Sequence, residues 1–531
     1  MHHARLAAVL ALLPLAAAAT SQIDPAGVLG TRLICGGGKL PPAVQQRFIE
    51  LAGGTNARIM LVNGASANAD DAAECATLLA TWRQKFPAAQ FTLLHTRDRA
   101  IADTDAFVEP LRKATGLWFG GGAQDRLAAA YLGTKLEHEV YALLARGGVV
   151  GGTSAGAAIQ SRRMIAEGNP DPVMATGFDL LPAGIVDQHF LKRNRLPRLL
   201  AALGKVDGCF GLGIDESTCV ELHGRILRVF GDSKALLVLA GKAGLPQRVV
   251  ELKSGEQADL VTWQRAARNR ATGPWPPSTM RAPKVEHGTL VIVGGGALPE
   301  AAVEAFVAAA GGTKAKVVVV TSANGDDASG ELPFTRRLQQ AGVTDIRLFH
   351  CPNPRDVTDA ALLPLASATA IWFGGGRQWR LCDAYENTKA IAAFEAVLAR
   401  GGVIGGSSAG ATIQGEFLVR GNPLGNTDEW CEGYDHGFGY LPGTAIDQHF
   451  LARNRIADLQ NLIAQVPQVI GIGIDEGTAL IVRGSIATVV GVSKVAVFDV
   501  RTADASARSK PLPMWLTTND RFDLLTGKQT N

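Results

Sequence analysis

The sequence has few charged and aromatic residues, no block of basic residues, and little net charge. Charged residues make up 19% of its 531 positions, aromatic residues 6%, and the formal net charge is +3. These values give no support to a dedicated nucleic-acid binder, which would carry a basic patch. Hydrophobic residues at 47% are enough for a large core. We therefore expect an ordinary globular protein that has no nucleic-acid partner.

Cysteines are also scarce and lack the spacing of a metal site. Seven are present and none belongs to a Cys-x-x-Cys pair, which argues against structural zinc. An odd number leaves at least one cysteine unpaired. An exported chain could form one or two disulfides, although a core of this size does not need them. We expect no metal and no cofactor. The cysteines are Cys35, Cys75, Cys209, Cys219, Cys351, Cys382 and Cys431.

The first 20 residues have the three parts of a secretory signal peptide. Arg5 supplies the positive charge, residues 6–15 form an apolar run, and Ala16–Ala19 supply small residues for cleavage. The run is too short to span a bilayer as a stable helix, and no later run reaches the ~18 apolar residues of a span. We expect an exported protein, extracellular or periplasmic, with no membrane span.

The chain repeats itself after 254–260 residues, as a tandem duplication does. The segment 117–124 recurs at 371–378, and the segment 151–157 recurs at 405–411. The second occurrence keeps the order of all the repeated motifs, with small differences in loop length. The other repeated pairs are Cys35–Gly38 with Val293–Gly296, Asp187–Phe190 with Asp447–Phe450, and Gly213–Glu216 with Gly473–Glu476.

A Pro-rich segment separates the two copies. Pro274, Pro276 and Pro277 cannot continue a helix or a central strand. The predicted organisation is a signal peptide at 1–20, a first domain at 27–272, a linker at 273–285 and a second domain at 286–531.

Each copy alternates short apolar runs with helical patterns. Residues 58–63, 116–120 and 147–151 are typical of buried parallel strands, and residues 137–146 have the apolar spacing of a helix. This alternation predicts an α/β fold with a doubly wound, mostly parallel sheet in each copy. Ligands bind beyond the carboxyl ends of such strands, where the Gly-rich turns fall.

The sequences Gly152–Gly156 and Gly406–Gly410 fit the pattern G-x-S-x-G. Each follows an apolar strand and precedes a helical stretch, which is the context of a nucleophile elbow. Ser154 and Ser408 would then be exposed at a helix start, where backbone N–H groups can stabilise an oxyanion. The alternative is a Gly-rich turn that binds phosphate. Retention of Ser and Ala in both copies favours the nucleophile.

A nucleophilic serine needs a base and a group that orients it. His189 and His449 lie in the polar string Asp-Gln-His-Phe, a better place for a base than His95 and His350 at the ends of apolar runs. A structural histidine is the alternative. For the third member the spacing does not choose between three pairs of acids, which are Glu216 and Glu476, Asp215 and Asp475, and Asp187 and Asp447.

Arginines follow each of these histidines. Guanidinium groups bind carboxylates in a bidentate manner, so their clustering suggests a substrate with carboxylates near the scissile bond. A solvated helix face is an equally good interpretation of the cluster alone. The second copy departs from the first by having Asp458 in the third position. The arginines are Arg193, Arg195 and Arg198 in the first copy, and Arg453 and Arg455 in the second.

Taken in order, these motifs resemble the cyanophycinase family, serine peptidases of the peptidase E and isoaspartyl dipeptidase clan. The resemblance covers nearly the whole chain twice, through F-G-G-G-x-Q, G-[TS]-S-A-G-A, D-Q-H-F-x-x-R-x-R and G-I-x-I-D-E. It implies a three-layer sandwich of the flavodoxin-like or class I glutamine amidotransferase-like type. It also implies hydrolysis of cyanophycin, a poly-aspartate that carries arginine on each β-carboxyl, to β-aspartyl-arginine dipeptides.

The resemblance assigns roles to particular residues. Ser154 and Ser408 would be the nucleophiles, His189 and His449 the bases, and Glu216 and Glu476 the groups that orient them. The N–H groups near Gly122 and Ala155, and near Gly376 and Ala409, would form the oxyanion holes. The substrate pockets would be lined by Gln124, Asp187, Gln188, Arg193, Arg195 and Arg198 in the first copy, and by Gln378, Asp447, Gln448, Arg453 and Arg455 in the second.

Departures from the pattern concern the second copy. Asp458 replaces a third arginine, and Arg377-Gln-Trp379 stands where the first copy has Ala123-Gln-Asp125. We therefore expect both sites to hold hydrolytic machinery and the first to be the better cyanophycinase. Because the family's members pair as homodimers, we expect the two copies to pack as an intrachain pseudo-dimer. The alternatives are a secreted dipeptidase for short isoaspartyl peptides and a non-catalytic protein that binds the polymer.

Overall fold

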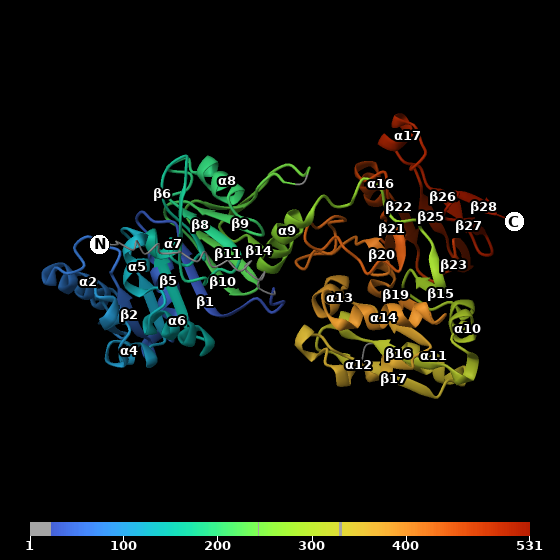
Figure 1. The fold of residues 1–531 in the computed structure, drawn as a ribbon, viewed down its shortest axis with the longest axis horizontal. Helices are drawn as coiled ribbons and strands as arrows, with labels where there is room; N and C mark the ends of the chain where they lie inside the picture. Colours follow the sequence, from blue (N-terminus) through green and yellow to red (C-terminus); the bar gives the residue numbers. More distant parts are fainter. Residues whose placement is uncertain (1–22, 243, 329–331, 531) are drawn as a thin grey trace, which may run out of the picture.

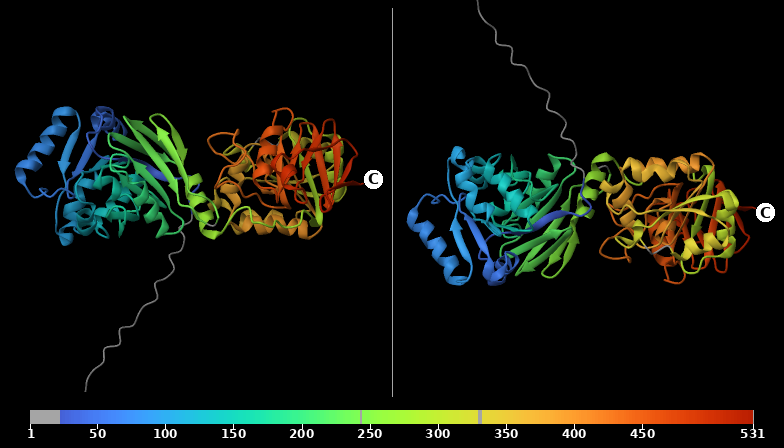
Figure 2. Two further views of the ribbon diagram at one scale, coloured as in Figure 1. Left: turned by 90° about the horizontal axis from the view of Figure 1, so that it is seen from above. Right: turned by 90° about the horizontal axis from the view of Figure 1, so that it is seen from below.

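The computed structural model describes residues 23–242, 244–328 and 332–530. It shows two lobes, one after the other along the chain and joined near α9 (Figures 1 and 2). We call residues 23–272 the first lobe and residues 285–530 the second lobe. The predicted signal peptide lies outside the described residues. Within these residues, no helix combines the length and the apolar character that crossing a membrane requires.

The first lobe is built on a sheet in the order β14-β11-β10-β1-β5-β4-β2-β3. The strands from β1 to β3 in this order are parallel, and β10, β11 and β14 continue the sheet antiparallel. The parallel strands are rich in Val, Ile and Leu because both of their faces are covered. The strands are β1 (Val28–Cys35), β2 (Arg58–Val62), β3 (Gln90–Leu93), β4 (Gly116–Phe119), β5 (Val149–Thr153), β10 (Thr218–Gly224), β11 (Ile226–Gly231) and β14 (Gln257–Asp259).

Helices cover both faces of this sheet, as expected for a doubly wound fold. Phe48 of α1 and Trp82 of α2 pack in one apolar cluster, whereas Val108 of α4 and Val140 of α6 pack in another. The helices are α1 (Pro42–Leu51), α2 (Ala72–Lys85), α3 (Arg99–Ala102), α4 (Asp105–Arg112), α5 (Gln124–Tyr131), α6 (Lys135–Ala145), α7 (Ala155–Ala158), α8 (Leu196–Gly204) and α9 (Leu260–Thr272).

A smaller sheet completes the first lobe, in the order β13-β12-β9-β8. Its strand β8 ends at Gln188, immediately before the predicted base. The neighbour β9 is parallel to β8 and ends at Ile214, two residues before Glu216. Two sheets therefore converge on the predicted site. The additional strands are β6 (Arg163–Glu167), β7 (Val173–Thr176), β8 (Gly184–Gln188), β9 (Phe210–Ile214), β12 (Lys234–Leu239) and β13 (Arg248–Lys253).

The second lobe repeats this plan. Its sheets have the orders β17-β16-β18-β19-β15-β23-β24-β27-β28 and β20-β21-β22-β25-β26. The strands are β15 (Val285–Val293), β16 (Lys316–Val320), β17 (Asp345–Phe349), β18 (Ala370–Phe373), β19 (Val403–Ser407), β20 (Gly415–Phe417), β21 (Leu441–Gln448), β22 (Ile470–Ile474), β23 (Thr478–Gly484), β24 (Ile486–Gly491), β25 (Val495–Phe498), β26 (Met514–Leu516), β27 (Arg521–Asp523) and β28 (Lys528–Thr530).

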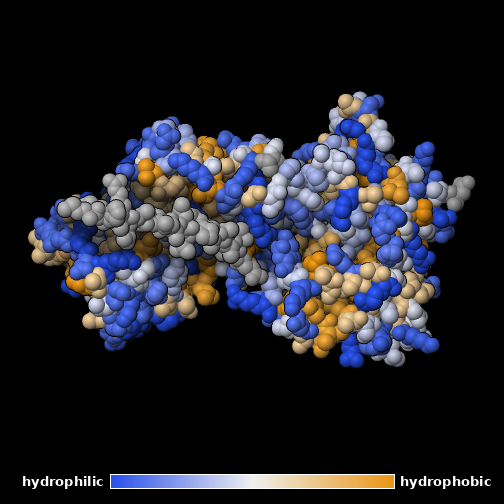
Figure 3. Space-filling view, viewed as in Figure 1, coloured by the Kyte–Doolittle hydropathy of each residue, from blue (hydrophilic) through white to orange (hydrophobic). Residues whose placement is uncertain are grey.

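Helices of the second lobe take the places of their counterparts in the first. On the face drawn in Figure 3, apolar residues show at the surface around α12, where Leu363 is 70% exposed. The helices are α10 (Glu300–Ala309), α11 (Leu332–Gln340), α12 (Asp359–Ala366), α13 (Gln378–Tyr385), α14 (Lys389–Ala399), α15 (Ala409–Thr412), α16 (Ile456–Gln465) and α17 (Ala505–Ser509).

The predicted α/β class is confirmed, with mostly parallel strands at the centre of each lobe. The apolar run 58–63 forms β2, the run 116–120 forms β4, and the helical pattern at 137–146 falls within α6 and the residue that follows it. The run 147–151 begins two residues too early, because Gly147 has a φ of 83° and belongs to the turn before β5. The smaller second sheet of each lobe was not predicted.

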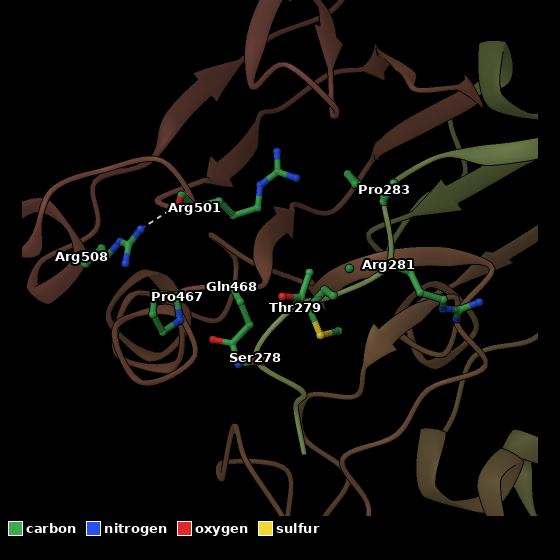
Figure 4. A pocket seen from close by; sticks show the side chains of 11 residues that line it. Ser278, Thr279, Arg281, Pro283, Pro467, Gln468, Arg501 and Arg508 are labelled. Atoms are coloured by element: carbon green, nitrogen blue, oxygen red, sulfur yellow. Dashed lines mark hydrogen bonds between the residues drawn. The ribbon is translucent and has the colours of Figure 1, made fainter. Parts of the chain in front are cut away.

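The Pro-rich segment follows the surface of the second lobe. Residues 273–284 contain neither helix nor strand. The Trp275 ring stacks on His436 with centroids 3.9 Å apart, and Gln468 donates a hydrogen bond to the Pro277 carbonyl. Beside this segment lies a cavity of about 410 Å³, into which Arg501 points from the second lobe (Figure 4). The segment is therefore held by the second lobe along much of its length.

Ion pairs and hydrogen bonds of arginines cross the contact between the lobes. Arg225 donates to Asp383 at 2.8 Å and to the Tyr434 hydroxyl at 2.8 Å, and Arg270 of α9 forms an ion pair with Glu432. The Arg225 guanidinium also lies over the Trp379 ring, 4.7 Å from its centroid. Trp379, which stands where the first copy has an aspartate, is thus part of the interface between lobes.

The two lobes contact each other through different surfaces. The position equivalent to Arg225 in the second lobe is Ser485, which has no guanidinium to offer. On the second lobe the contacts come instead from α13 and the loop around Tyr434. A two-fold pair would use the same surface on both sides. The arrangement is head to tail.

Candidate active site

The predicted nucleophiles lie at sharp turns between a strand and a helix. Ser154 follows β5 and has φ 53° and ψ −110°, and Ser408 follows β19 with φ 56° and ψ −113°. Such a backbone is strained for a residue that carries a Cβ. The turn is closed so tightly that a Cβ on Gly152 would lie 2.1 Å from the Gly156 carbonyl oxygen. This is the geometry of a nucleophile elbow.

Each serine is joined to a histidine and a glutamate by hydrogen bonds. In the first lobe, Ser154 Oγ lies 2.8 Å from His189 Nε2, and His189 Nδ1 lies 2.7 Å from Glu216 Oε1. In the second lobe the corresponding distances are 2.9 Å from Ser408 to His449 and 2.6 Å from His449 to Glu476. The structure brings together both predicted triads with the same connectivity.

The competing acids have other partners. Asp215 accepts hydrogen bonds from the Lys192 N–H and the Ser233 hydroxyl, and Asp475 accepts from the N–H groups of Leu451 and Ala452. These bonds fix the turn that follows each histidine. Glu216 is therefore the carboxylate that contacts the His189 ring.

A run of three glycines supports each triad, a role that the sequence interpretation missed. In the first lobe the carbonyl of Cys35 accepts the Ser154 N–H, and the carbonyl of Gly36 accepts the His189 N–H. A Cβ on Gly37 would lie 2.4 Å from His189 Cε1, and one on Gly38 would lie 3.0 Å from Glu216 Oε2. The repetition of Cys35–Gly38 as Val293–Gly296 was the signal that could have shown this role.

The second lobe has the same glycine support. The His449 N–H donates to the Gly294 carbonyl, and a Cβ on Gly295 would lie 2.3 Å from His449 Cε1. A Cβ on Gly296 would lie 3.0 Å from Glu476 Oε2. Side chains at these positions would displace the base or its carboxylate, so only glycine fits.

The predicted oxyanion donors lie next to the serines. Ala155 is the first residue of α7, where an N–H group has no partner within the helix. Gly121 approaches Ser154 closely enough that an added Cβ would be 3.6 Å from the serine Cβ, and Gly122 follows it with φ 140°. In the second lobe Ala409 and Gly376 occupy the same places. Their contact with an oxyanion stays a prediction.

Burial lowers the pKa of both histidines below its ordinary value. Desolvation is the largest cause for His189, the hydrogen bond with Glu216 opposes it, and the charges of Arg193 and Arg195 lower the pKa further. Burial is also the largest cause of the lowered pKa of His449, and the hydrogen bond with Glu476 opposes it. Each ring is therefore held in the neutral form that a general base requires.

Behind the first triad, an aspartate is buried against an arginine. Asp187 is fully buried at the end of β8, and burial raises its pKa while Arg198 opposes that rise. Arg198 Nε lies 2.9 Å from the Asp187 carboxylate, and a second N–H of the same guanidinium also donates to it. Both groups were expected to line the substrate pocket. In this structure they form a buried ion pair with each other.

The other predicted pocket residues divide into two kinds. The buried Gln124 and Gln378 amides donate to backbone carbonyls 41 and 42 residues further on, which lie in β6 in the first lobe and in the loop after β20 in the second. Arg193 is exposed on the turn after the base, where its N–H donates to the His189 carbonyl. Arg453 makes the same backbone contact with His449 and is also exposed.

The arginines around the buried aspartate are rearranged in the second lobe. Arg420, from the loop after β20, donates to Asp447 at 2.9 Å and also to Asp458 at 2.8 Å. It thereby replaces the guanidinium that Arg198 supplies in the first lobe. Arg455 lies 3.0 Å from Asp447, and its counterpart Arg195 lies 3.5 Å from Asp187. Both arginines donate to the backbone carbonyl of the following glutamine, and Arg195 also donates to the Gln188 side chain.

This rearrangement leaves one amide oxygen without a partner. Gln448, which precedes the base, is 5% exposed. Among the residues that the structure describes, its Oε1 receives no hydrogen bond, whereas the Oε1 of Gln188 receives one from Arg195. The second site therefore differs from the first in the polar groups next to its base.

The family model of peptidase family S51 matches residues 33–230 and 289–490. The two matched regions fall in the two lobes and cover more than half of the chain. The chain belongs to peptidase family S51 and carries the family's domain twice. The family resemblance inferred from the motifs is confirmed.

Among curated relatives, the chain is 35% identical over 201 residues to a protein named cyanophycinase from Synechococcus elongatus, over 36% of this chain and 61% of that protein. It is 36% identical over 184 residues to the cyanophycinase of Geminocystis herdmanii, over 33% of this chain and 66% of the relative. The match thus spans less than two thirds of either relative. A crystal structure of a peptidase from an acI-B1 actinobacterium is 22% identical, with a TM-score of 0.37, over 44% of this chain and 98% of that one.

Proposed function

We propose that this chain is a serine peptidase with two active sites, one in each lobe. The observation that carries the proposal is the repeated chain of hydrogen bonds from serine to histidine to glutamate, with the serine on a strained turn in both lobes. Retention of this arrangement in both copies of a tandem duplication favours a catalytic role over a structural one. Membership of family S51 supports the same activity.

The reaction follows from the geometry of the first site. Ser154 Oγ attacks the scissile carbonyl carbon, and His189 Nε2 takes the hydroxyl proton as the new C–O bond forms. The N–H groups of Ala155 and Gly122 receive the oxyanion. His189 then gives the proton to the leaving amine, and an acyl-enzyme is formed. A water molecule, activated by the same ring, hydrolyses the ester and frees the serine.

Glu216 has a supporting part in this cycle. Its carboxylate accepts the Nδ1–H of His189, which directs Nε2 toward the serine and stabilises the imidazolium that forms during each proton transfer. The lowered pKa of His189 keeps the resting ring neutral and ready to accept a proton. Ser408, His449 and Glu476 would act in the same way in the second lobe.

The proposed substrate is cyanophycin, released as β-aspartyl-arginine dipeptides. The relatives that carry the name cyanophycinase support this choice. The exposed Arg193 and Arg453, each four residues after the base, could bind the free carboxylates of the polymer's arginyl groups. We further propose that the chain is exported by residues 1–20, since an insoluble polymer outside the cell has to be digested there.

We also propose that the two lobes act as an intrachain pair. The ion pairs of Arg225 and Arg270 with the second lobe support a fixed arrangement, although a head-to-tail one. Solution scattering from the full chain tests this. A single elongated body is expected, and a profile of two lobes moving freely on a linker would contradict the proposal.

Incubation with purified cyanophycin and mass analysis of the products tests the function. The wild-type chain should release dipeptides, and the Ser154→Ala/Ser408→Ala variant should release none. If only short β-aspartyl peptides are hydrolysed, the chain is a dipeptidase and the polymer assignment is wrong. If a serine-directed covalent probe labels neither serine and nothing is hydrolysed, the chain is a binding protein.

A further inference from the structure

Two cysteines face each other under the first active site. Cys35 is the last residue of β1 and Cys219 is the second residue of β10, and the two are direct partners in the sheet. Their Sγ atoms lie 2.8 Å apart, and both side chains are fully buried. Neither residue was assigned a role by the motif analysis.

The register of this pair suits a covalent bond. The Gly36 N–H donates to the Thr218 carbonyl, so the bond runs between the residue after Cys35 and the residue before Cys219. The cysteines therefore form a non-hydrogen-bonded antiparallel pair, whose Cα atoms are about 4.5 Å apart. Disulfides span Cα separations of about 4.4–6.8 Å, so no backbone movement is needed.

The second lobe shows that the fold does not require thiols here. Val293 and Ala479 occupy the equivalent positions, with the same pairing between β15 and β23. The Gly294 N–H donates to the Thr478 carbonyl, as in the first lobe. An apolar pair thus fills this place in an otherwise identical setting, and the two cysteines are a feature of the first lobe alone.

We propose that Cys35 and Cys219 form a disulfide when the chain folds in an oxidising medium. The two thiols lose two protons and two electrons as the S–S bond forms. The electrons pass by thiol–disulfide exchange to an oxidised partner, a small-molecule or protein disulfide, which is reduced to two thiols.

The bond forms before the sheet is closed. In the folded chain neither sulfur is exposed, so no oxidant reaches it. Burial, together with the neighbouring Cys35 thiol, also raises the pKa of the Cys219 thiol, which disfavours the reactive thiolate. Other cysteines have different neighbours. The thiols of Cys75, Cys351 and Cys382 donate to the backbone carbonyls of Ala69, Asp356 and His436.

The position of the bond gives it a consequence for the site. Cys35 leads into the glycine run that contacts His189, and its carbonyl accepts the Ser154 N–H. Cys219 follows Glu216 by three residues. The disulfide joins β1, which leads into the glycine run, to β10, which begins two residues after Glu216. It closes a loop of 184 residues along the chain. Loops of this length lose much conformational entropy when they are cross-linked.

The test is a thiol count on the full chain, refolded in a buffer of reduced and oxidised glutathione. After denaturation and alkylation without reductant, five of the seven cysteines should be modified. Trypsin should then yield a linked pair of peptides, 33–39 with 206–225. Because the second peptide also contains Cys209, cleavage after Glu216 is needed to show that Cys219 carries the link.

The matched control is Cys35→Val/Cys219→Ala, which copies the pair that the second lobe already accommodates. In this variant every remaining cysteine should be alkylated. Reductant should lower the melting temperature of the wild-type chain by roughly 5–10 °C and leave that of the variant unchanged. Alkylation of all seven cysteines in the refolded wild type, or a link from Cys35 to Cys209, would overturn the proposal.

Discussion

The first and second lobes join a serine, a histidine and a glutamate by hydrogen bonds of similar length, but the arginine that pairs with the buried aspartate comes from a different element in each lobe. In the first lobe Arg198 reaches Asp187 from α8. In the second lobe the α8 position has become Asp458, and Arg420 reaches Asp447 from the loop after β20. In both lobes a guanidinium group contacts the buried aspartate, although a different segment of the chain supplies it.

This difference shows that a side chain missing from one position can be replaced by one from another segment. Asp458 alone suggested a weakened pocket in the second copy. Together with Arg420 and Asp447 it forms a network in which Arg420 and Asp447 are buried and the Asp458 side chain is 42% exposed. Within the described part of the chain, the Oε1 of Gln448 receives no hydrogen bond, which distinguishes the second site from the first. The hydrogen bonds from Ser408 to His449 and from His449 to Glu476 are kept.

The largest effect is expected when the serines are replaced, and the single variants separate the contributions of the two lobes to the activity. Ser154→Ala/Ser408→Ala should lower the rate of cyanophycin hydrolysis by about 10⁴-fold or more, since loss of the nucleophile removes the acyl-enzyme route. Of the single variants, Ser154→Ala should remove the larger share of the activity. The rate of dipeptide release measures both. Full activity in Ser154→Ala combined with none in Ser408→Ala would reverse the ranking of the sites.

A second prediction tests the exchange of arginines. Arg198→Ala leaves Asp187 buried without its bidentate partner and should cost about 3–5 kcal/mol in the free energy of unfolding of the first lobe. Arg420→Ala should cost the second lobe less, because the remaining arginine is closer there: Arg455 lies 3.0 Å from Asp447, whereas Arg195 lies 3.5 Å from Asp187. Urea unfolding measures both losses.

The rescue variant for this exchange is Ala166→Arg/Arg198→Asp. Ala166 is the counterpart of Arg420, since Gln124 and Gln378 donate to the carbonyls of these two residues. The pair transplants the arrangement of the second lobe into the first and should recover much of the lost stability. A double variant no more stable than Arg198→Asp alone would show that the two arrangements are not interchangeable.

A third prediction concerns the glycine run, measured in a Ser408→Ala background so that only the first site acts. Gly37→Ala places a Cβ 2.4 Å from His189 Cε1 and should lower the rate about 10²-fold by displacing the base. Gly53→Ala is the matched control. Gly53 has a similar φ of 108°, but its nearest atoms are 3.9 Å from the added Cβ. Equal losses in both variants would assign the effect to backbone strain.

The smallest expected effect is a shift in pH dependence. Hydrolysis should decline in acid as His189 becomes protonated, with a midpoint below the ordinary pKa of a histidine because burial lowers that of His189. Arg193→Gln removes a charge that lowers this pKa. The acid limb should therefore move to higher pH. Lys192→Gln, which removes a charge from the neighbouring position, is the control, and an equal shift in both would contradict the assignment to Arg193.

Local patterns made much of the site predictable. Apolar runs that end in Gly or Asn predicted β2, β4 and β5, and repetition selected Ser154 and His189 from many candidates. Three pairs of acids are repeated, so Glu216 was assigned only by the family resemblance. The helical stretch predicted after the elbow is α7, a short helix that ends at Ala158. These features depend on neighbours in the sequence, which is why the sequence could show them.

What could not be predicted depends on contacts between distant segments. Arg420 meets Asp447 across 27 residues, through a loop that has no counterpart of equal length in the first copy. Trp379 was taken as a change in the substrate pocket, whereas its ring packs against Arg225 of the other lobe. No spacing or periodicity marks either contact.

The glycine run holds the triad through backbone carbonyls and through the absence of side chains. Main-chain hydrogen bonds are the same whatever residues surround them, so the scaffold of each triad is insulated from substitutions elsewhere. After duplication, each copy could therefore change its pocket, its charges and its lobe contacts without losing its reacting geometry. A molecule built in this way can keep one chemistry in both halves while it acquires two specificities.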